Sequence, residues 1–266
     1  MSLVTTVLNA APRASMILLN RPPVNAMNRE LLSQLAAAVR SVEKEKGDQG
    51  WGLVLASAFH SNSPVFTAGL DLAEMHNKPA SSVATFWGAL QDVFVALYGT
   101  KLATVCALSG TSPAGGCFLA TLCDWRVGAN DLPRAVIGLN EAKFGLVAPG
   151  WFAAPLATCV GARKAEKMLQ LGELVPFADA HRAGLIDELV ARDKVISVAL
   201  DRASEWASNG PANARHLSKL TTRQALLDTL KTPEQRKADA DLFVGRVSEA
   251  SVQAALDTYL ANLKKR

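Results

Sequence analysis

The sequence predicts an α/β protein: a core of alternating strands and helices, followed by an all-helical C-terminal region. Two patterns carry this prediction. Short β-like runs alternate with amphipathic helical periods up to about residue 192, and from about residue 193 only helical periods follow. The composition agrees, because 49% hydrophobic and 20% charged residues are typical of a folded globular chain and not of a disordered one.

The predicted strands are short apolar runs that end at turn-forming residues. They cover residues 14–20, 52–57, 104–108, 125–128 and 185–190. Because helical periods separate them, these strands are expected to form the α/β core.

Three helices are expected between these strands. The first begins after Asn28, whose side chain can accept a hydrogen bond from a first-turn amide, and an apolar residue recurs every three or four positions over residues 31–42. The second begins near Ser82 and carries an apolar face. The third spans residues 163–171 and ends at Gly172, which can adopt the left-handed conformation of a C-cap.

The C-terminal region is predicted to form further helices at residues 195–208, 212–220, 233–246 and 251–264. No Gly/Ser linker separates it from the core, so we expect it to pack against the core or against a partner subunit. We therefore divide the chain into a core with the active site, residues 1–192, and a helical region for assembly, residues 193–266.

The charge balance does not indicate a nucleic-acid partner. Lys and Arg number 28 against 24 acidic residues, a net charge of +4, and part of the surplus lies at residues 264–266. We interpret this tail as a solvated end, although a mild positive charge suits an anionic small molecule. The longest apolar runs, such as residues 195–200, are far shorter than the ~20 residues that cross a bilayer, so no membrane span is expected.

The cysteines indicate reducing surroundings. Cys106, Cys117, Cys123 and Cys159 include no CxxC pair, and three of them lie in apolar stretches. Buried, reduced thiols in an intracellular protein are therefore expected. The first 19 residues carry one arginine and no long apolar run, so no secretory signal peptide is visible.

Two loops of small residues interrupt the regular alternation. Residues 64–72 (PVFTAGLDL) follow a strand and precede another apolar helix, and residues 109–120 (SGTSPAGGCFLA) join a strand ending at Gly110 to a helix starting near Gly116. Amides at a helix N-terminus lack acceptors and carry partial positive charge, and small residues let a ligand approach them. Either loop alone is typical of an ordinary turn, but two such loops facing each other would form an oxyanion hole for an enolate.

Other uses of the second loop fit less well. It lacks the GxxxxGK[ST] pattern of a P-loop. Residues 110–114 resemble a nucleophile elbow, but Ala114 replaces the last glycine and Pro113 removes an amide. Cys117 has no histidine near it in the sequence, although one could approach it in the fold, and no histidines show the spacing of metal ligands. Nucleophilic and metal catalysis are therefore disfavoured, and no metal site is expected.

A single carboxylate stands in the apolar stretch of residues 135–150. Burial there would raise the pKa of Glu141 and make it a base that works near neutral pH. The alternative from the residues alone is a surface glutamate that pairs with Lys143 at the start of a short helix.

These motifs resemble, in order and spacing, those of the crotonase (enoyl-CoA hydratase/isomerase) superfamily. The matching segments are residues 66–72 (FTAGLDL), 114–117 (AGGC), 123–124 (CD) and 138–141 (GLNE), and the resemblance extends from residues 20–27 (NRPPVNAM) through the helical tail. Within the superfamily, residues 137–149 (IGLNEAKFGLVAP) are most similar to the mitochondrial type of Δ3,Δ2-enoyl-CoA isomerase.

The resemblance implies a ClpP/crotonase-like spiral of ββα units with a C-terminal helical trimerisation region, and hence a homotrimer or a dimer of trimers. It implies that the amides of Ala68 and Gly115 form the oxyanion hole for an acyl-CoA thioester and that Glu141 is the base. No cofactor is expected, because coenzyme A is part of the substrate. The residues expected to bind the substrate are Ala68, Gly69, Leu70, Asp71, Leu72, Gly115, Phe118, Leu139 and Asn140.

One departure from the family's hydratase pattern indicates the reaction. Family hydratases carry a glutamate two residues after the last glycine of the second loop, where this chain has Phe118. Hydration divides its proton transfers between two carboxylates, whereas moving a double bond from C3 to C2 needs one base. The prediction is therefore an enoyl-CoA delta isomerase of unsaturated fatty-acid β-oxidation, in which Glu141 moves a proton from C2 to C4.

Several alternatives remain. An enoyl-CoA hydratase, a dienoyl-CoA isomerase or a thioesterase is the nearest, although a dienoyl-CoA isomerase needs a second acid and only Asp71 is near. From a different class, the chain could be a non-catalytic relative that binds acyl-CoA or RNA, and the presence of Glu141 argues against it. The mitochondrial matrix is the expected location, and a peroxisome-type organelle is less favoured because residues 264–266 (KKR) are not a peroxisomal tripeptide.

Overall fold

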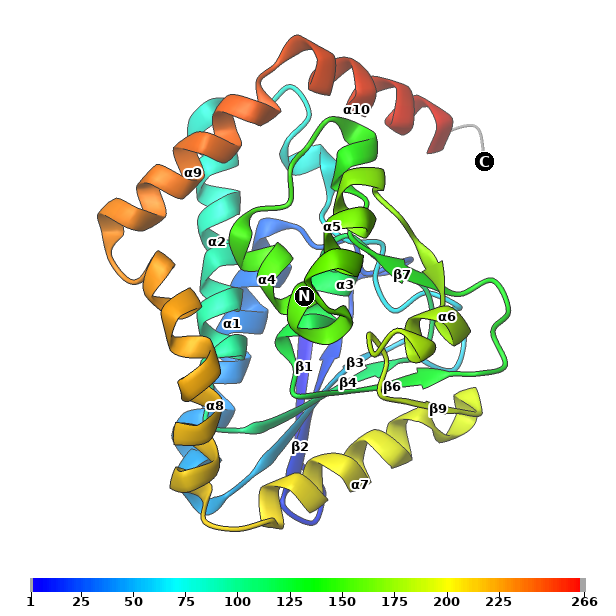
Figure 1. Cartoon of the computed structure of the whole chain (residues 1–266), viewed down its shortest axis with the longest axis vertical. Coiled ribbons are helices and arrows are strands. Elements are labelled where there is room, and N and C mark those ends of the chain that lie inside the picture. The colour runs from blue at the N-terminus through cyan, green and yellow to red at the C-terminus, as the bar shows by residue number, and fades with distance from the viewer. Residues whose placement is uncertain (1, 264–266) are drawn as a thin grey trace.

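A computed structural model describes the fold over residues 2–263, so the basic end at residues 264–266 lies outside the described residues (Figure 1). A six-stranded sheet forms the centre, in the order β1-β2-β3-β4-β6-β9. β1 is antiparallel to β2, and every later pair is parallel. The strands are β1 (Val4–Ala11), β2 (Ala14–Leu19), β3 (Gly52–Ser57), β4 (Ala103–Leu108), β6 (Trp125–Ala129) and β9 (Glu188–Val190).

Helix α7 (Val195–Ser208) covers one face of this sheet (Figure 1). It does so with a stripe of small buried side chains, including Ala199 and Ala203, which pack on Val54 and Val105 of the sheet. The approach is close, because a Cβ added to Gly52 would lie 2.5 Å from the Ala203 carbonyl oxygen. Glycine is therefore required where β3 begins.

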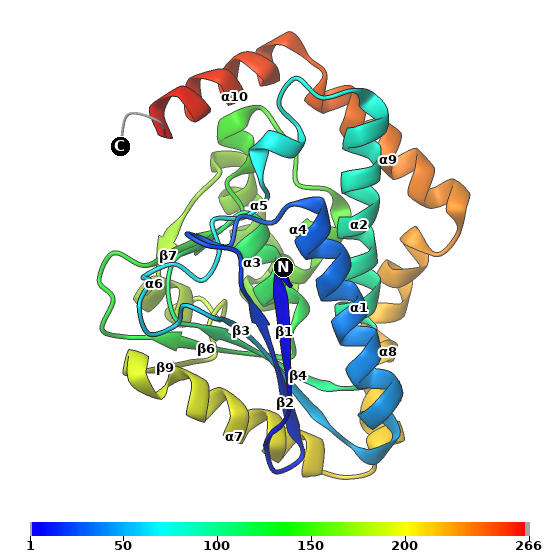
Figure 2. The same ribbon diagram turned by 180° about the vertical axis from the view of Figure 1, so that it is seen from behind.

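The other face is covered by α1 (Arg29–Lys46), α2 (Ala80–Tyr98) and α3 (Gly115–Leu122), as Figure 2 shows. Asn28 caps α1 by accepting a hydrogen bond from the Leu31 amide, as predicted. Helix α2 is long and apolar enough to pass a length-and-composition test for a membrane span. Its apolar residues are buried inside the molecule, however, as in a core helix.

A second, three-stranded sheet orders the region around the second predicted loop. It joins β5 (Ser112–Pro113), β7 (Val136–Gly138) and β8 (Val175–Pro176) in the order β5-β7-β8. Helices α4 (Gly150–Val160), α5 (Ala162–Leu171) and α6 (Phe177–Arg182) belong to the same part of the chain. Because β5 lies directly before α3, this sheet fixes where the N-terminus of α3 points.

The tail wraps around the core. Helix α8 (Ala212–Leu227) leads to α9 (Pro233–Val247), which runs beside α2, and α10 (Ala250–Leu263) crosses one end of the molecule (Figures 1 and 2). A capping box at Thr232 and Gln235 starts α9. The expectation that the tail packs against the core is confirmed.

Most predicted elements are present, and the differences are local. The strand predicted from residue 185 begins at Glu188, and the helix predicted to end at residue 220 continues to Leu227. The apolar helix expected after the first loop is α2, and a short 3-10 helix (Leu72–Glu74) lies between the loop and α2. β1 and α4 were not predicted from the sequence. β1 alternates poorly, and α4 contains Pro155, which weakens a helical pattern.

Candidate active site

The two loops of small residues face each other. A parallel bridge joins Val65 to Thr111: the Thr111 amide donates to the Pro64 oxygen at 2.8 Å, and the Phe66 amide donates to the Thr111 oxygen at 3.0 Å. A Cβ added to Gly110 would lie 2.3 Å from Pro64, so only glycine permits this approach. The predicted juxtaposition of the loops is confirmed.

The segment before α1 holds the first loop in place. Asn25 is fully buried; its side-chain amide donates to the Phe66 oxygen at 3.0 Å, and its backbone oxygen accepts from the Thr67 hydroxyl at 2.6 Å. Next to it, the Met27 amide donates to the Gly69 oxygen at 2.8 Å. These bonds give the loop one conformation, which is what a preorganised site requires.

One of the two predicted oxyanion donors is corrected, because its amide already has an acceptor. The Ala68 amide donates to the Val24 oxygen at 2.9 Å, so it is not available to an incoming oxyanion. Within residues 2–263, the Leu70 amide has no acceptor. It lies beside the N-terminus of α3, because a Cβ added to Gly115 would be 3.3 Å from the Leu70 nitrogen. Gly69, at φ +90°, makes the turn that presents this amide.

The N-terminus of α3 is set by an unusual backbone. Ala114 has φ +48° and ψ −114°, a conformation that is costly for a residue with a side chain. Its amide donates to the Gly138 oxygen at 2.8 Å, which ties this turn to β7. The following amide, that of Gly115, belongs to the first turn of α3 and has no intrahelical acceptor.

Glu141 enters the same region from β7. Gly138, at φ +155°, ends that strand, and a Cβ there would lie 2.1 Å from the Glu173 oxygen. A short 3-10 helix (Glu141–Phe144) follows, and it presents the carboxylate. One oxygen, Oε2, is buried without a hydrogen-bond partner among the described residues, and burial raises the pKa of Glu141 to about 7. The alternative pairing with Lys143 is not seen among the described residues, where Oε2 has no hydrogen-bond partner.

A cavity of about 300 Å³ brings these groups together. Glu141 lines it, and so do predicted substrate-binding residues Ala68, Leu70, Asp71, Leu72 and Asn140. Much of the remaining wall is apolar and comes from distant parts of the chain. The further lining residues include Val24, Ala26, Met75, Trp87, Phe144, Leu146, Val147, Phe152, Phe243, Tyr259 and Leu260.

Four predicted substrate-binding residues do not line this cavity, and two of them, Phe118 and Leu139, have side chains that lie elsewhere. Phe118 is fully buried and stacks on Phe152, with ring centroids 3.9 Å apart, so Phe152 separates it from the cavity. Leu139 is 1% exposed and borders a neighbouring cavity of about 400 Å³, which shares Glu141. Both side chains belong to the hydrophobic core instead of the cavity wall.

Asp71 lines the cavity but is already engaged. Its carboxylate pairs with Arg21 at 2.8 Å and accepts a hydrogen bond from the Ala73 amide at 3.1 Å, which caps the short 3-10 helix. Gly69 and Gly115 contribute their backbone beside the cavity and are not among the residues that line it.

The rival chemistries find no support in the geometry. Burial raises the pKa of Cys117 well above its usual value, so its thiolate is disfavoured. The histidines bond elsewhere: His60 to Ser57, His76 to Asp257, His181 to Ile186 and His216 to Gly99. Across residues 2–263, no group of His, Cys, Asp and Glu side chains could hold a metal ion.

Comparison with known proteins gives close matches over nearly the whole chain. A family model described as "Enoyl-CoA hydratase/isomerase" matches residues 13–266. The chain is 40% identical over 244 residues to human "Enoyl-CoA delta isomerase 1, mitochondrial", covering 92% of this chain and 78% of that protein. The mouse protein of the same name is 38% identical over 93% of this chain and 83% of its own length.

Solved structures agree. The crystal structure of human mitochondrial delta3-delta2-enoyl-CoA isomerase matches with a TM-score of 0.91 and 37% identity, covering 99% of both chains. Among the sequence relatives, a protein of Mycobacterium tuberculosis named "Probable enoyl-CoA hydratase EchA17" is 30% identical over 203 residues, covering 75% of this chain and 73% of that protein. An enoyl-CoA hydratase structure from Bacillus halodurans matches with a TM-score of 0.80 at 20% identity, covering 97% of this chain and 100% of that chain.

Proposed function

The chain belongs to the enoyl-CoA hydratase/isomerase family, and from this premise we propose that it is a Δ3,Δ2-enoyl-CoA isomerase. The match to the family model and to the human crystal structure confirms the predicted crotonase fold. The relatives named as delta isomerases share more of this sequence than the relatives named as probable hydratases do. The substrate is accordingly a 3-enoyl-CoA thioester, of the kind that arises in β-oxidation of unsaturated fatty acids.

A single free carboxylate in the cavity carries this proposal. Glu141 and Asp71 are the acidic residues that line it, and Asp71 is occupied by Arg21 and the Ala73 amide. Phe118, at the position where family hydratases carry a second glutamate, is buried and apolar. One base is enough for an isomerase, whereas a hydratase needs a second group to handle the proton of water.

The proposed mechanism moves one proton and leaves the atom count of the substrate unchanged. Ionised Glu141 removes a proton from C2, and the electron pair delocalises through the C3–C4 double bond and the thioester carbonyl to give a dienolate. The amides of Leu70 and Gly115 donate to its oxygen. Protonated Glu141 then returns the proton to C4, which leaves the double bond between C2 and C3.

The reaction itself is the first test. Purified protein is supplied with 3-decenoyl-CoA, and the conjugated 2-enoyl thioester is followed by its ultraviolet absorbance. Isomerisation is expected, and 2-decenoyl-CoA supplied alone should show no loss of absorbance from hydration. Hydration without isomerisation would favour a hydratase. Conversion of a dienoyl-CoA alone would favour a dienoyl-CoA isomerase, and release of free coenzyme A would favour a thioesterase. Acyl-CoA binding without turnover would indicate a non-catalytic relative.

The assignment of the donors can be tested at single backbone atoms. Replacing the Leu70 residue by its α-hydroxy acid converts the amide to an ester, which removes the N–H group and keeps the side chain. We expect kcat to fall about a hundredfold or more, as for loss of one oxyanion donor elsewhere. The same replacement at Ala68 is the matched control, because it removes the bond to Val24 and leaves the hole intact. A larger loss of kcat at Ala68 than at Leu70 would reverse the assignment.

Location and assembly follow from the same likeness. The delta isomerases reported above are named as mitochondrial, and we place this protein in the mitochondrion as well, in the matrix. We also propose a homotrimer without a bound cofactor or metal. Sedimentation equilibrium should give three times the mass of one chain, or six times for a dimer of trimers, and a monomer would contradict the proposal.

A further inference from the structure

Trp87 forms part of the buried wall of the cavity. Its side chain is 2% exposed, and the wall around it is completed by Phe152 of α4 and Phe243 of α9. Trp87 stacks on Phe243 with ring centroids 3.5 Å apart and lies 6.1 Å from Phe152. The exposed lining residues are Ala68, Val147 and Tyr259, so the cavity opens to solvent on their side. A flexible chain that enters from this side and extends past Glu141 into the buried part of the cavity would meet Trp87.

Asp239 holds this wall from behind. It lies on α9, one turn before Phe243, and its carboxylate accepts three hydrogen bonds. The donors are Trp87 Nε1 at 2.7 Å, Gln91 Nε2 at 2.8 Å and Trp151 Nε1 at 3.0 Å. Trp87, Gln91 and Trp151 are each no more than 3% exposed, so within the described structure these bonds replace contacts with water.

The residue type matters for this arrangement. An indole has one donor and no acceptor, so each tryptophan reaches Asp239 in one ring orientation only. A carboxylate has two oxygens with several lone pairs, and it can serve both indoles and the Gln91 amide together. The bonds from Trp87 and Trp151 go to different oxygens, which fixes the carboxylate plane as well. Asp239 itself does not line the cavity, so it acts through Trp87.

We propose that Asp239 is a positioning residue that fixes Trp87 as the end wall of the acyl pocket and so limits the acyl chain length that the enzyme accepts. The inference rests on the proposed function, because it takes the flexible chain in the cavity to be the acyl group of a 3-enoyl-CoA. It assigns the helical tail a direct part in substrate selection, since Asp239 and Phe243 both come from α9.

The test compares chain lengths. kcat/KM is measured for 3-hexenoyl-, 3-decenoyl- and 3-hexadecenoyl-CoA with the wild type, Trp87→Ala, Asp239→Leu and Asp239→Asn. Trp87→Ala should raise the ratio of kcat/KM for the longest to the shortest ester about tenfold or more, because each further buried methylene is worth about fourfold in binding. Asp239→Leu should change the ratio in the same direction, and Asp239→Asn, which keeps one acceptor oxygen, should change it less.

Matched controls separate positioning from a general loss of structure. Asp241→Asn alters an exposed carboxylate of the same helix, which pairs with Lys237, and should leave the ratio unchanged. A variant that is merely less stable loses activity equally at every chain length, and such a uniform loss in Asp239→Leu and Asp239→Asn would overturn the proposal. A shifted ratio in Trp87→Ala alone would also overturn it, because the wall would then not depend on Asp239.

A second readout keeps the inference distinct from the proposed function. Dissociation constants of the saturated hexanoyl-, decanoyl- and hexadecanoyl-CoA esters are measured by calorimetry with the same variants. If the wild type isomerises none of the 3-enoyl esters, the proposed function fails, and the binding series still decides the role of Asp239. If the wild type turns over substrate but every Asp239 variant has the same chain-length profile as the wild type, the inference is contradicted and the proposed function stands. Asp239→Asn provides the comparison if Asp239→Leu does not fold.

Discussion

At the scale of single residues, the environment of Glu141 combines two properties that a base for carbon acids needs. Its buried Oε2 has no hydrogen-bond partner in the described structure, and burial holds its pKa at about 7. A carboxylate in this state is more basic than one in water, yet it is substantially ionised at neutral pH. The neighbouring Asp71 shows the opposite arrangement, because its ion pair with Arg21 and its capping bond leave it no such role.

Glu141→Gln is therefore expected to remove nearly all turnover. The amide cannot accept the C2 proton, so kcat should fall by about ten-thousandfold, the upper end for a general base. Acyl-CoA binding, measured by calorimetry, should change little because the two side chains have the same shape. Wild-type kcat/KM should decline about tenfold per pH unit below about pH 7, as Glu141 becomes protonated. Substantial activity of the variant would contradict the assignment of the base.

The same shift predicts how stability depends on pH. In the unfolded chain Glu141 ionises above pH 4.5, whereas in the folded protein it resists ionisation up to about pH 7. The folded state thus binds more protons in this range, and stability falls as the pH rises through it. At 1.36 kcal/mol per pKa unit, the loss is about 3 kcal/mol. Urea unfolding of wild type and Glu141→Gln should show the variant gaining this amount relative to wild type between pH 4 and pH 8, and a constant difference would refute it.

The sequence predicts the type of chemistry at the site more accurately than the atoms that carry it out. An isolated carboxylate in an apolar stretch is a local pattern, so Glu141 could be predicted. Which amide of the first loop is free could not, because it depends on the Val24 oxygen, more than forty positions away in the sequence from Ala68. Likewise Trp87 fits the apolar stripe of a core helix, and only its partners on α4 and α9 identify it as a cavity wall.

At the scale of elements, the junction between β7 and the 3-10 helix sets the position of Glu141. We expect Gly138→Ala to misplace it, because a Cβ at φ +155° would lie 2.1 Å from the backbone oxygen of Glu173. Stability should fall by about 1–3 kcal/mol, and kcat should fall more than KM rises. Gly88→Ala is the matched control: Gly88 lies in α2 with open space around it, so stability should stay the same or rise. Equal effects of the two substitutions would contradict the argument.

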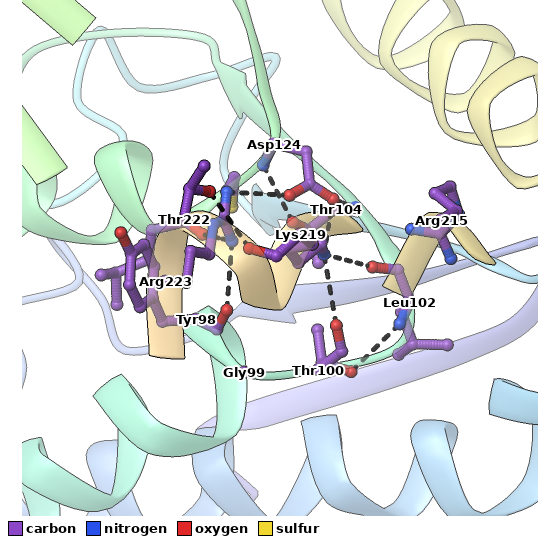
Figure 3. A network of polar contacts seen from close by, with 12 residues as sticks. Tyr98, Gly99, Thr100, Leu102, Thr104, Asp124, Arg215, Lys219, Thr222 and Arg223 are labelled. Atoms are coloured by element: carbon purple, nitrogen blue, oxygen red, sulfur yellow. Dashed lines mark hydrogen bonds and ion pairs between the residues drawn. The ribbon is translucent and has the colours of Figure 1, made fainter. Parts of the chain in front are cut away.

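A buried ion cluster fastens α8 to the core (Figure 3). Asp124, whose side chain is 5% exposed, pairs with Lys219 at 2.7 Å and Arg223 at 2.9 Å. Burial opposes ionisation of Asp124, but the charges of Lys219 and Arg223 outweigh it and hold the pKa of the carboxyl below its usual value. The two cations also donate to backbone oxygens, Lys219 to that of Leu102 and Arg223 to that of Tyr98, so the cluster joins α8 to the last residue of α2 and to the residue before β4.

Asp124→Leu is expected to destabilise the protein by about 3–5 kcal/mol, because it leaves two buried cations without a counter-charge. Denaturant unfolding measures this loss directly. The folded variant should keep its kcat, since the cluster lines a different cavity from that of Glu141. Asp48→Leu, at an exposed pair with Lys101, is the control and should have little effect on stability. If Asp124→Leu lost no more stability than Asp48→Leu, packing alone would hold α8 against the core.

Helix and strand predictions succeeded where the pattern is local and failed where tertiary structure decides. The apolar period of α7 and the cap of α1 are properties of single segments, and α7 has the predicted bounds. By contrast, β1 is mostly exposed and exists because it pairs with β2. The segment between the first loop and α2 likewise depends on distant partners: the Asp71 amide donates to the Met27 oxygen, and the tail residue Gln253 accepts from the Asn77 amide and donates to the Met75 oxygen.

At the scale of the whole molecule, the helical tail is part of the catalytic unit. α7 covers a face of the central sheet, α9 supplies Phe243 to the cavity wall, and α10 supplies Tyr259 and Leu260. α10 is attached to the segment after the first loop by a 2.6 Å contact between Asp257 and His76. The predicted region for assembly therefore also shapes the substrate cavity, whether or not it joins subunits.

This integration predicts the outcome of shortening the chain. A protein ending at residue 192 lacks α7, so Val54, Val105 and the other buried residues of that sheet face would be exposed to water. Such a large apolar surface is rarely tolerated in a monomer. We expect this fragment to lack a cooperative thermal transition, and cooperative unfolding would show that residues 1–192 form a domain on their own.

A chain ending at residue 249 keeps α7 to α9 and loses only α10, so it should unfold cooperatively but bind acyl-CoA more weakly, because one side of the cavity is open. The contrast between the two truncations separates the part of the tail that completes the core from the part that closes the site.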